Sequence, residues 1–401
     1  MTVLVIGPSS AGKTTYLESI KAADIYFANQ LSDKNIPESG YIHYNLLQGV
    51  KKYKNEDHFP REWDLMHEPI LKKILDSGRI KKVIILVTPL PELIKRITKR
   101  DIIEPSLKTE IKYPSNLWKK ICTEIDLNAV YYQLFDLLKT FSLTSHCILS
   151  SENAPDDYVA DKVYIGHYLR GEFPRSATQQ EVVRINEMPG AQYQAVDLPH
   201  GMISAVGGHK HLNGSRDSTF SKIRNVTYQD KTVLDIGCAQ GDILFRSERL
   251  GAKKIVGVDI KQDRHDAAKA IGSILHSRAE FLLGDFLDFE FPEKFDDVYA
   301  LNVIHHISDI RRFILKAANL TKRRLIIEFP TLNDPKFNRL ASMPANLDSL
   351  PLMGVSHSKI DQTFTFTPAA VQMMVSEAGD FTHELLESPI KGRKIMVFSP
   401  S

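Results

Sequence analysis

The chain has 401 residues, of which 43% are hydrophobic and 25% are charged, and its formal net charge is +2. This length suits two domains that each bury a core, and the small net charge argues against a strongly electrostatic nucleic-acid binder. The three cysteines, Cys122, Cys147 and Cys238, form no CxxC pair, so they suggest neither a disulfide framework nor a zinc site.

The chain begins with an apolar strand pattern at residues 2–7, without the basic segment and cleavable apolar core of a signal peptide. No uninterrupted apolar run approaches the roughly 20 residues that span a bilayer. We therefore expect a soluble, cytoplasmic protein.

Apolar segments alternate with amphipathic ones in the first part of the chain, which predicts parallel βαβ units and an α/β fold. The segment WKKICTEIDLNAVYYQLFDLLKT (118–140) predicts one long helix. The alternation fades after Ser151, and we expect a first domain over residues 1–152. Strand-like segments occur at residues 2–7, 40–47, 81–88 and 145–151.

The turn after the first strand, GPSSAGKT, fits the pattern G-x-x-x-x-G-K-[ST]. Consecutive backbone N–H groups can wrap a β-phosphate only where side chains do not intrude, which explains the two glycines. The lysine supplies a charge to the β- and γ-phosphates, and the threonine hydroxyl can bind Mg²⁺. The alternative is an ordinary strand–helix turn. The predicted ATP-binding residues are Gly7, Ser9, Ser10, Ala11, Gly12, Lys13 and Thr14, with Lys13 catalytic and Thr14 the metal ligand.

Residues 1–152 resemble P-loop kinases of the nucleoside and small-molecule type, particularly in VIILVTPLPELIKRITKR (83–100). The resemblance implies that Arg96 and Arg100 contact the transferring phosphates, where the transition state needs cations. The alternative is that Arg96, Lys99 and Arg100 form a solvated helix face.

The kinase resemblance is incomplete at the expected magnesium-binding aspartate. The strand at residues 83–88 ends in Thr88, and no apolar strand ends in an unambiguous Asp. Asp33 and Glu38 are the acids best placed to accept a proton from an acceptor hydroxyl, and we select Asp33 as the candidate base. The alternative is that Asp33 belongs to a turn.

Residues 153–225 predict a linker followed by a cap or substrate region. The acidic, polar stretch SENAPDDYVADK (151–162) suits a linker. The rest of the region is rich in Gly, His and Ser and shows no clear periodicity.

Strand and helix patterns alternate again over residues 226–401, which predicts a second domain. Its strand-like segments are residues 232–237, 254–260, 279–286, 295–303 and 324–329, with a final strand at 393–399 after a helix at 367–379. The stretch from Thr331 to Thr363 is irregular, and we expect it to supply part of an acceptor pocket.

The turn LDIGCAQG (234–241) resembles motif I of class I S-adenosylmethionine-dependent methyltransferases, with Ala239 in place of the middle glycine. The resemblance extends through the ends of the next three strands and implies a Rossmann-like fold. A dinucleotide-binding dehydrogenase, which uses a similar glycine turn, is the alternative. The resemblance implies which residues contact each part of the cofactor. Asp235, Gly237, Cys238 and Gly241 would contact the amino-acid end, and Asn302 would line the methionine end. Asp259 with Ile260 would contact the ribose, and Asp285 with Phe286 would contact the adenine.

The pair His305-His306 allows two interpretations. Imidazole titrates near neutral pH, so His305 is a candidate general base. The same pair is common in the methyltransferase family across unrelated substrates, which favours a packing or helix-start role.

The sequence therefore predicts a bifunctional enzyme of two doubly wound domains, a P-loop kinase using ATP and Mg²⁺ and a Rossmann-like methyltransferase using S-adenosylmethionine. One hypothesis is sequential phosphorylation and methylation of a sugar, glycan or small molecule. A second is RNA modification, because residues 193–208 resemble the lead-in of tRNA wobble-uridine carboxymethyl-transfer enzymes. A third is a P-loop domain that senses nucleotide and regulates methylation. The oligomeric state is not predicted.

Overall fold

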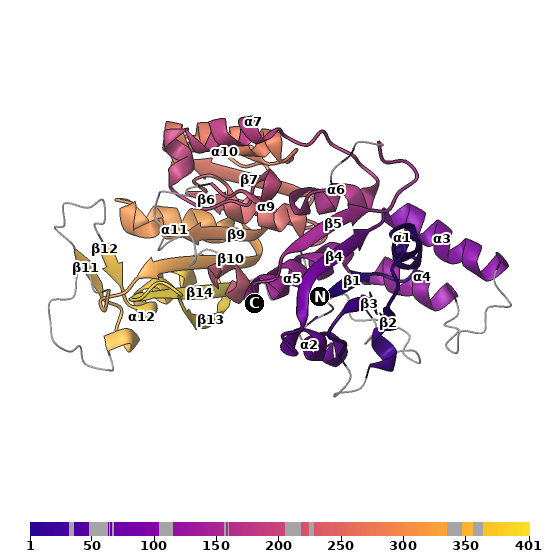
Figure 1. Cartoon of the computed structure of the whole chain (residues 1–401). Coiled ribbons are helices and arrows are strands. Elements are labelled where there is room, and N and C mark those ends of the chain that lie inside the picture. The colour runs from indigo at the N-terminus through magenta and orange to yellow at the C-terminus, as the bar shows by residue number, and fades with distance from the viewer. Residues whose placement is uncertain are drawn as a thin grey trace. The chain divides into compact units, whose positions relative to one another are not determined.

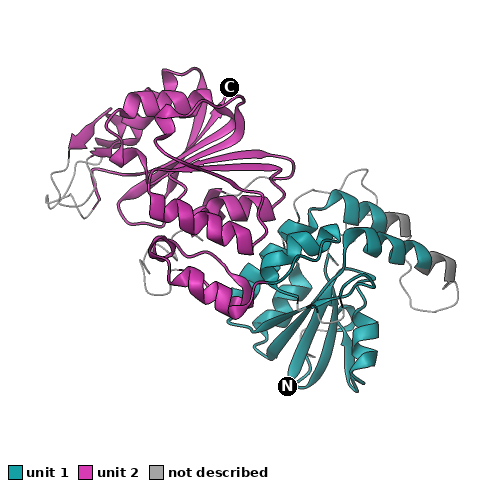
Figure 2. Cartoon of the chain, turned by 90° about the horizontal axis from the view of Figure 1, so that it is seen from above, with its two compact units in different colours: residues 1–176 teal, residues 177–401 magenta. Residues whose placement is uncertain are grey.

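The computed structural model describes residues 1–31, 36–47, 63, 65, 68–103, 115–155, 158, 160–204, 218–223, 228–334, 347–355 and 364–401, with the side chains of residues 100–103 and 115–117 excepted. They form two compact units, Met1–Ser176 (unit 1) and Ala177–Ser401 (unit 2), which Figure 2 colours separately. The division falls inside the segment 153–225, for which we expected a linker and a cap. None of the described helices combines the length and apolar character that crossing a membrane requires.

Unit 1 alternates strands and helices as the sequence predicts. Its described elements are β1 (Thr2–Gly7), α1 (Lys13–Ser19), β2 (Ile25–Phe27), η1 (Ala28–Gln30), β3 (Gly40–Asn45), α2 (Pro69–Asp76), β4 (Ile80–Val87), α3 (Leu90–Ile103), α4 (Ser115–Glu124), α5 (Leu127–Thr140), β5 (Ser145–Leu149), η4 (Lys162–Tyr164) and α6 (Ile165–Arg170).

The sheet of unit 1 has the strand order β2-β3-β1-β4-β5, and all of these neighbours pair in parallel. Every residue of β1 is buried, which explains the continuous apolar run of a strand inside a parallel sheet. The chain leaves β1 toward β2 on one side and leaves β4 toward β5 on the other. The carboxyl ends of β1 and β4 therefore flank a switch point, the place where open α/β sheets bind ligands. This sheet is compatible with the doubly wound fold that we predicted.

The prediction of one long helix over residues 118–140 is wrong, because two helices occupy this stretch. Asp126 has an extended backbone, with φ −71° and ψ 93°, and its side chain accepts a hydrogen bond from the Ala129 N–H at 3.1 Å. This side chain caps a new helix, α5, after α4 has ended at Glu124.

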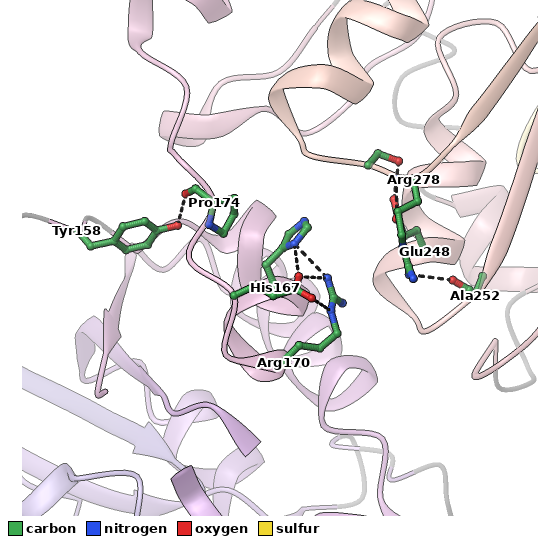
Figure 3. A network of polar contacts seen from close by, with 9 residues as sticks. Tyr158, His167, Arg170, Pro174, Glu248, Ala252 and Arg278 are labelled. Carbon is green, nitrogen blue, oxygen red and sulfur yellow. Dashed lines mark hydrogen bonds and ion pairs between the residues drawn. The ribbon is translucent and has the colours of Figure 1, made fainter. Parts of the chain in front are cut away.

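Polar contacts hold the last residues of unit 1 (Figure 3). The Tyr158 hydroxyl donates to the carbonyl of Pro174 at 2.6 Å, and Arg170 and His167 both contact the carboxylate of Glu172. The hydrogen bond from Arg170 lowers the pKa of Glu172 to about 2, against the opposing effect of burial.

Unit 2 contains a second sheet. Its described elements are α7 (Gln179–Asn186), η5 (Pro189–Gln192), η6 (Pro199–Gly201), β6 (Thr232–Ile236), α9 (Asp242–Arg249), β7 (Lys254–Asp259), α10 (Gln262–Ile274), β8 (Glu280–Leu283), η7 (Phe286–Asp288), β9 (Phe295–Leu301), η8 (Ile304–His306), α11 (Ile310–Asn319), β10 (Thr321–Pro330), η9 (Leu347–Ser349), β11 (Met353–Val355), β12 (Phe364–Phe366), α12 (Pro368–Ser376), β13 (Phe381–Glu387) and β14 (Arg393–Pro400). Figure 1 labels most of these elements.

The sheet of unit 2 has the order β13-β14-β10-β9-β6-β7-β8. Strands β10, β9, β6, β7 and β8 pair in parallel, whereas β14 runs antiparallel to both of its neighbours. The chain proceeds from β6 toward β8 on one side and from β9 toward β10 on the other, so the switch point lies between β6 and β9. The predicted α/β alternation is confirmed here, and Figure 2 shows helices on both faces of this sheet.

Strand β13 was not predicted from the sequence. Most of its residues are exposed and it pairs with β14 alone, so it lacks the apolar signature of the inner strands. The carboxylates of Glu384 and Glu387 on this edge suit a strand that must not pair with another chain.

Polar contacts also join α9 to the residues that follow α10 (Figure 3). The Glu248 carboxylate accepts hydrogen bonds from the Ser277 hydroxyl and from the backbone N–H of Arg278. The Arg278 guanidinium also reaches the carbonyl of Ala252 at 3.5 Å, so Arg278 contacts both the end of α9 and the residues that follow it.

A buried carboxylate lies near the start of β9. Asp297 is completely buried and accepts hydrogen bonds from Arg323 and Arg324, and the Nε of Arg323 lies 2.9 Å from its Oδ1. Arg324 also donates to the carbonyl of Ile223 at 2.7 Å, which ties the helical residues 218–223 to the sheet.

We expect Asp297→Ala to lower the unfolding free energy of unit 2 by about 3–5 kcal/mol, because it leaves buried guanidinium charge without its carboxylate. Urea unfolding followed by circular dichroism measures this loss. The control is Glu293→Ala, which removes an exposed partner of Lys254 and should leave the unfolding midpoint nearly unchanged. Equal midpoints for the two variants would contradict this account of Asp297.

Candidate nucleotide and cofactor sites

The loop between β1 and α1 contains two residues with left-handed backbone. Gly12 has a φ of 85° and precedes the helix, and Ser10 also lies in the left-handed region with a φ of 65°. Lys13 is buried, and its Nζ donates to the carbonyls of Gly7 at 2.9 Å and Pro8 at 2.5 Å. The ammonium group is therefore held against the loop.

A side chain at Gly7 would meet backbone, and one at Gly12 would meet a side chain and require a strained left-handed backbone. A Cβ at Gly7 would lie 2.9 Å from the carbonyl oxygen of Leu86, and one at Gly12 would lie 2.7 Å from the Ser150 Oγ. The Thr88 hydroxyl lies 3.4 Å from the carbonyl oxygen of Ala11. The loop thus packs directly against the carboxyl ends of β4 and β5.

Arg96 of α3 lies beside the same loop. Its Nη1 donates to the Ser150 Oγ at 2.8 Å, its Nη2 donates to the Ser150 carbonyl at 3.1 Å, and its ion pair with Glu92 measures 2.5 Å. A Cβ at Gly12 would be 3.5 Å from the Arg96 Nη1. Arg96 is therefore directed toward the loop, whereas Lys99 is exposed.

Glu92 holds this arginine and was not singled out in the sequence. Its carboxylate also accepts from the Ser151 hydroxyl at 2.6 Å and from the backbone N–H of Glu152 at 3.2 Å. Burial raises the pKa of Glu92, but these hydrogen bonds and Arg96 outweigh it and lower the pKa. Glu92 is thus held as a carboxylate between α3 and the end of β5.

Two predicted residues of this site lie outside the described part of the chain, namely Asp33 and the side chain of Arg100. Thr14 is exposed in the first turn of α1, and Ser9 is buried in the loop.

A buried carboxylate, Glu68, lies near β3 and was missed in the sequence. It accepts hydrogen bonds from the Tyr44 hydroxyl and from the Trp63 Nε1, both at 2.9 Å. Burial is the main cause that raises the pKa of Tyr44, and the neighbouring Glu68 carboxylate raises it further. Tyr44 and Glu68 are 24 positions apart in the chain, so no local pattern could reveal the contact.

The second glycine turn joins β6 to α9 in unit 2. Gly237, Ala239 and Gly241 have φ values of 74°, 48° and 83°, so Ala239 adopts the left-handed backbone although it replaces a glycine. The backbone N–H groups of Gly237 and Cys238 donate to the carbonyl of Val258 at 2.8 and 3.1 Å. The Cys238 side chain is buried against Gly257, and this burial raises the pKa of its thiol.

Asp259 ends β7 and connects the loop after β6 with the loop after β7. It is 5% exposed, its Oδ2 accepts from the Ala239 N–H at 2.8 Å and its Oδ1 accepts from the Lys261 N–H at 2.8 Å. A carboxylate oxygen has a second lone pair beyond such a bond, so each oxygen can still accept a ligand hydroxyl. Asp235 is also buried, in β6 beside Tyr299 of β9.

The two residues that we predicted to contact adenine, in the segment after β8, differ in burial. Asp285 is exposed and accepts a hydrogen bond from the Leu287 N–H at 2.9 Å. The Phe286 ring is buried in the core, 5.1 Å from the ring of Phe313. Two apolar side chains near Asp259 are exposed. Ile260, the next residue in the chain, is 64% exposed, and Leu283, which pairs with Asp259 in the sheet, is 39% exposed.

Asn302 directly follows β9, has a φ of 59° and lies in a polar network with two other strands. Its side-chain amide donates to Glu328 of β10 and accepts from Arg393 of β14. The next residue, Val303, lies 3.0 Å from a Cβ placed on Gly237, so this segment contacts the glycine turn through Val303. Glu328 is a charge inside an apolar strand, a signal that the sequence offered and that we did not use.

The two histidines after β9 differ in exposure. His305 is 2% exposed and His306 is exposed, and their ring centroids lie 4.1 Å apart.

Comparisons with known proteins show a methyltransferase domain in unit 2. Residues 233–324 match the family model described as a methyltransferase domain. The chain is 33% identical over 101 residues to a ubiquinone biosynthesis O-methyltransferase of Bradyrhizobium diazoefficiens, covering 25% of this chain and 40% of that protein. It is 39% identical over 82 residues to a tRNA U34 carboxymethyltransferase of Campylobacter hominis, covering 20% of this chain and 29% of that protein.

A solved structure, a magnesium protoporphyrin IX methyltransferase from Synechocystis PCC 6803 with bound SAM, is 15% identical, with a TM-score of 0.38 over 57% of this chain and 100% of that chain. The chain thus spans well under half the length of both curated relatives. Unit 2 contains a class I S-adenosylmethionine-dependent methyltransferase domain, built around residues 233–324.

Proposed function

We propose that unit 2 transfers the methyl group of S-adenosylmethionine to an oxygen or nitrogen nucleophile of an acceptor. The observation that carries the proposal is the buried carboxylate of Asp259, which the loops after β6 and β7 hold at the carboxyl edge of the sheet. A carboxylate in this position accepts both hydroxyls of a ribose. The match to a methyltransferase domain selects an adenosyl cofactor over a dinucleotide.

The cofactor's other groups have candidate partners along the carboxyl edge of the sheet. Gly237 and Gly241, next to the buried Asp235, would hold the amino-acid end. The exposed carboxylate of Asp285 suits the adenine amino group, and the apolar side chains of Ile260 and Leu283 suit its ring faces. We assign the ring contact to these two residues because Phe286 is buried in the core.

The chemistry of methyl transfer depends mainly on alignment. The bound cofactor supplies an electrophilic sulfonium methyl group, and the protein must place the nucleophile in line with it. The turn at Asn302 and Val303 meets the glycine turn and is suited to set this alignment. His305 remains the candidate base for an acceptor that must lose a proton.

Methyl-labelled S-adenosylmethionine tests this function. We expect the full chain to transfer label from it into a small-molecule or glycan fraction of a cell extract. Label in RNA instead would support the alternative acceptor class, that of the tRNA-modifying relative. Absence of label from every fraction, with an active methyltransferase as positive control, would contradict the function.

We propose for unit 1 that the loop Gly7–Thr14 binds ATP with Mg²⁺ and that the unit transfers the γ-phosphoryl group to a hydroxyl. Two cationic groups support this, the Lys13 ammonium at the loop and the Arg96 guanidinium beside Gly12. Transition-state charge on a γ-phosphoryl group requires cations in such places. Thr14 would bind the metal ion.

Sequential action on one acceptor would explain the presence of both units in one chain. Phosphorylation of a hydroxyl would be followed by methylation of that phosphate or of a neighbouring oxygen. The kinase product, once isolated, should then be a better methyl acceptor than the unphosphorylated compound. Equal methylation of the two compounds would leave the alternative, a nucleotide-sensing unit 1 that regulates methylation.

A further inference from the structure

We propose that residues 189–194, which we call the strap, are part of the cofactor site, and that Gln240 is the positioning residue that ties the strap to the glycine turn. This inference rests on the proposed methyltransferase function. The strap comprises η5 and the following residues Tyr193 and Gln194, and it lies about fifty positions before the turn that it contacts.

The first contact is a hydrogen bond from the glycine turn. Gln240 lies between the left-handed residues Ala239 and Gly241, and its side chain is completely buried. Its Nε2 donates to the carbonyl of Gly190 at 2.6 Å. Burial of an amide is unfavourable unless it is bonded. This bond satisfies the Nε2 of the buried side chain, whereas its Oε1 has no hydrogen-bond partner among the described residues.

The second contact is a backbone approach at Gly190 that excludes any side chain. A Cβ there would lie 1.9 Å from the carbonyl oxygen of Asp263 and 2.8 Å from the backbone nitrogen of Arg264. Both atoms belong to the first turn of α10, which directly follows Asp259 and Lys261. Since backbone atoms cannot rotate away, only glycine permits this approach.

A third contact holds the far end of the strap. The Arg264 guanidinium lies 3.8 Å from the centroid of the Tyr193 ring, a cation–π arrangement. The helix before the strap, α7, also packs on α10 (Figure 1).

The strap therefore bridges the two loops that would hold opposite ends of the cofactor. Gln240 belongs to the turn for the amino-acid end, and Asp263 follows the aspartate for the ribose. A bridge of this kind keeps both loops in the binding geometry before the cofactor arrives, which lowers the cost of ordering them. By reciprocity, bound cofactor should order the strap.

The test uses S-adenosylhomocysteine binding to the full chain, measured by calorimetry. In Gln240→Met, which keeps the volume and removes the hydrogen bond, we expect the Kd to rise about tenfold, the equivalent of one buried hydrogen bond. Gly190→Ala should raise it at least as much. The matched controls are Gln262→Met, an exposed glutamine of α10, and Gly272→Ala, where a Cβ meets Phe281 at an ordinary 3.4 Å.

Hydrogen exchange supplies a readout that a purely structural role would not move. S-adenosylhomocysteine should slow amide exchange in residues 189–194 of the wild type, and in Gln240→Met it should protect the glycine turn but not the strap. If Gln240→Met binds S-adenosylhomocysteine with the wild-type Kd, or if the ligand does not protect the strap in the wild type, the inference about the strap is overturned and the proposed function stands. Failure of the wild type to bind S-adenosylhomocysteine would overturn the proposed function as well.

Discussion

Asp259→Asn is expected to weaken the binding of S-adenosylmethionine by two to four orders of magnitude. Two hydrogen bonds from ribose hydroxyls to a charged acceptor contribute about 1.5–3 kcal/mol each. The wild-type carboxylate also uses both oxygens for backbone N–H groups, those of Ala239 and Lys261. An asparagine must place its NH₂ group against one of these donors, so the substitution also disturbs the loops.

Calorimetry with S-adenosylhomocysteine measures this effect. The matched control is Asp288→Asn, an exposed carboxylate at the end of η7, for which we expect an unchanged Kd. Thermal unfolding of both variants separates loss of binding from loss of fold. A Kd within threefold of the wild type in a folded Asp259→Asn variant would remove the ribose role from this residue.

Lys13→Met is expected to reduce the phosphoryl transfer that we propose for unit 1 by about a thousandfold, the upper part of the range for loss of one transition-state charge contact. Methionine keeps most of the buried stem of the lysine, and it removes the ammonium that now lies against the carbonyls of Gly7 and Pro8. Release of γ-labelled phosphate, or its transfer to an acceptor, measures the loss.

The control for this variant is Lys99→Met, which removes an exposed cation from α3. We expect Lys99→Met to retain activity and Arg96→Met to lose it, since only Arg96 lies beside the loop. Equal activity in Lys13→Met and the wild type would exclude a phosphate-binding role for this loop. Nucleotide binding with no transfer to any hydroxyl would support the sensing alternative.

The sequence predicted the local elements of both units that depend on adjacent residues. Each glycine turn is contiguous in the chain, so its backbone requirements appear as a spacing, and the left-handed φ values at Gly12, Gly237 and Gly241 agree with it. The position of Asp259 at the end of a strand followed from the same local pattern. Parallel sheets in both units followed from continuous apolar strands.

The partners of those residues could not be predicted, because folding brings them from distant positions. Arg96 and Ser150 are 54 positions apart, Gln240 and Gly190 are 50 apart, and Asn302 and Arg393 are 91 apart. No periodicity encodes such contacts. The networks around Glu92 and Glu328 therefore appear only in the structure.

Two errors in the predicted elements have local physical causes. The apolar pattern of residues 118–140 continues across Asp126, and the pattern alone did not show that this side chain would cap a new helix. Strand β13 lies at the edge of the sheet, where exposure removes the apolar alternation that identifies a strand.

We propose that the chain holds two cofactor sites of different chemistry, one in each unit. Equilibrium dialysis of the full chain against labelled ATP with Mg²⁺ and labelled S-adenosylmethionine tests it most directly. We predict simultaneous binding of both, with Lys13→Met losing only ATP and Asp259→Asn losing only S-adenosylmethionine. Competition between the two ligands, or loss of both in either folded variant, would contradict the claim.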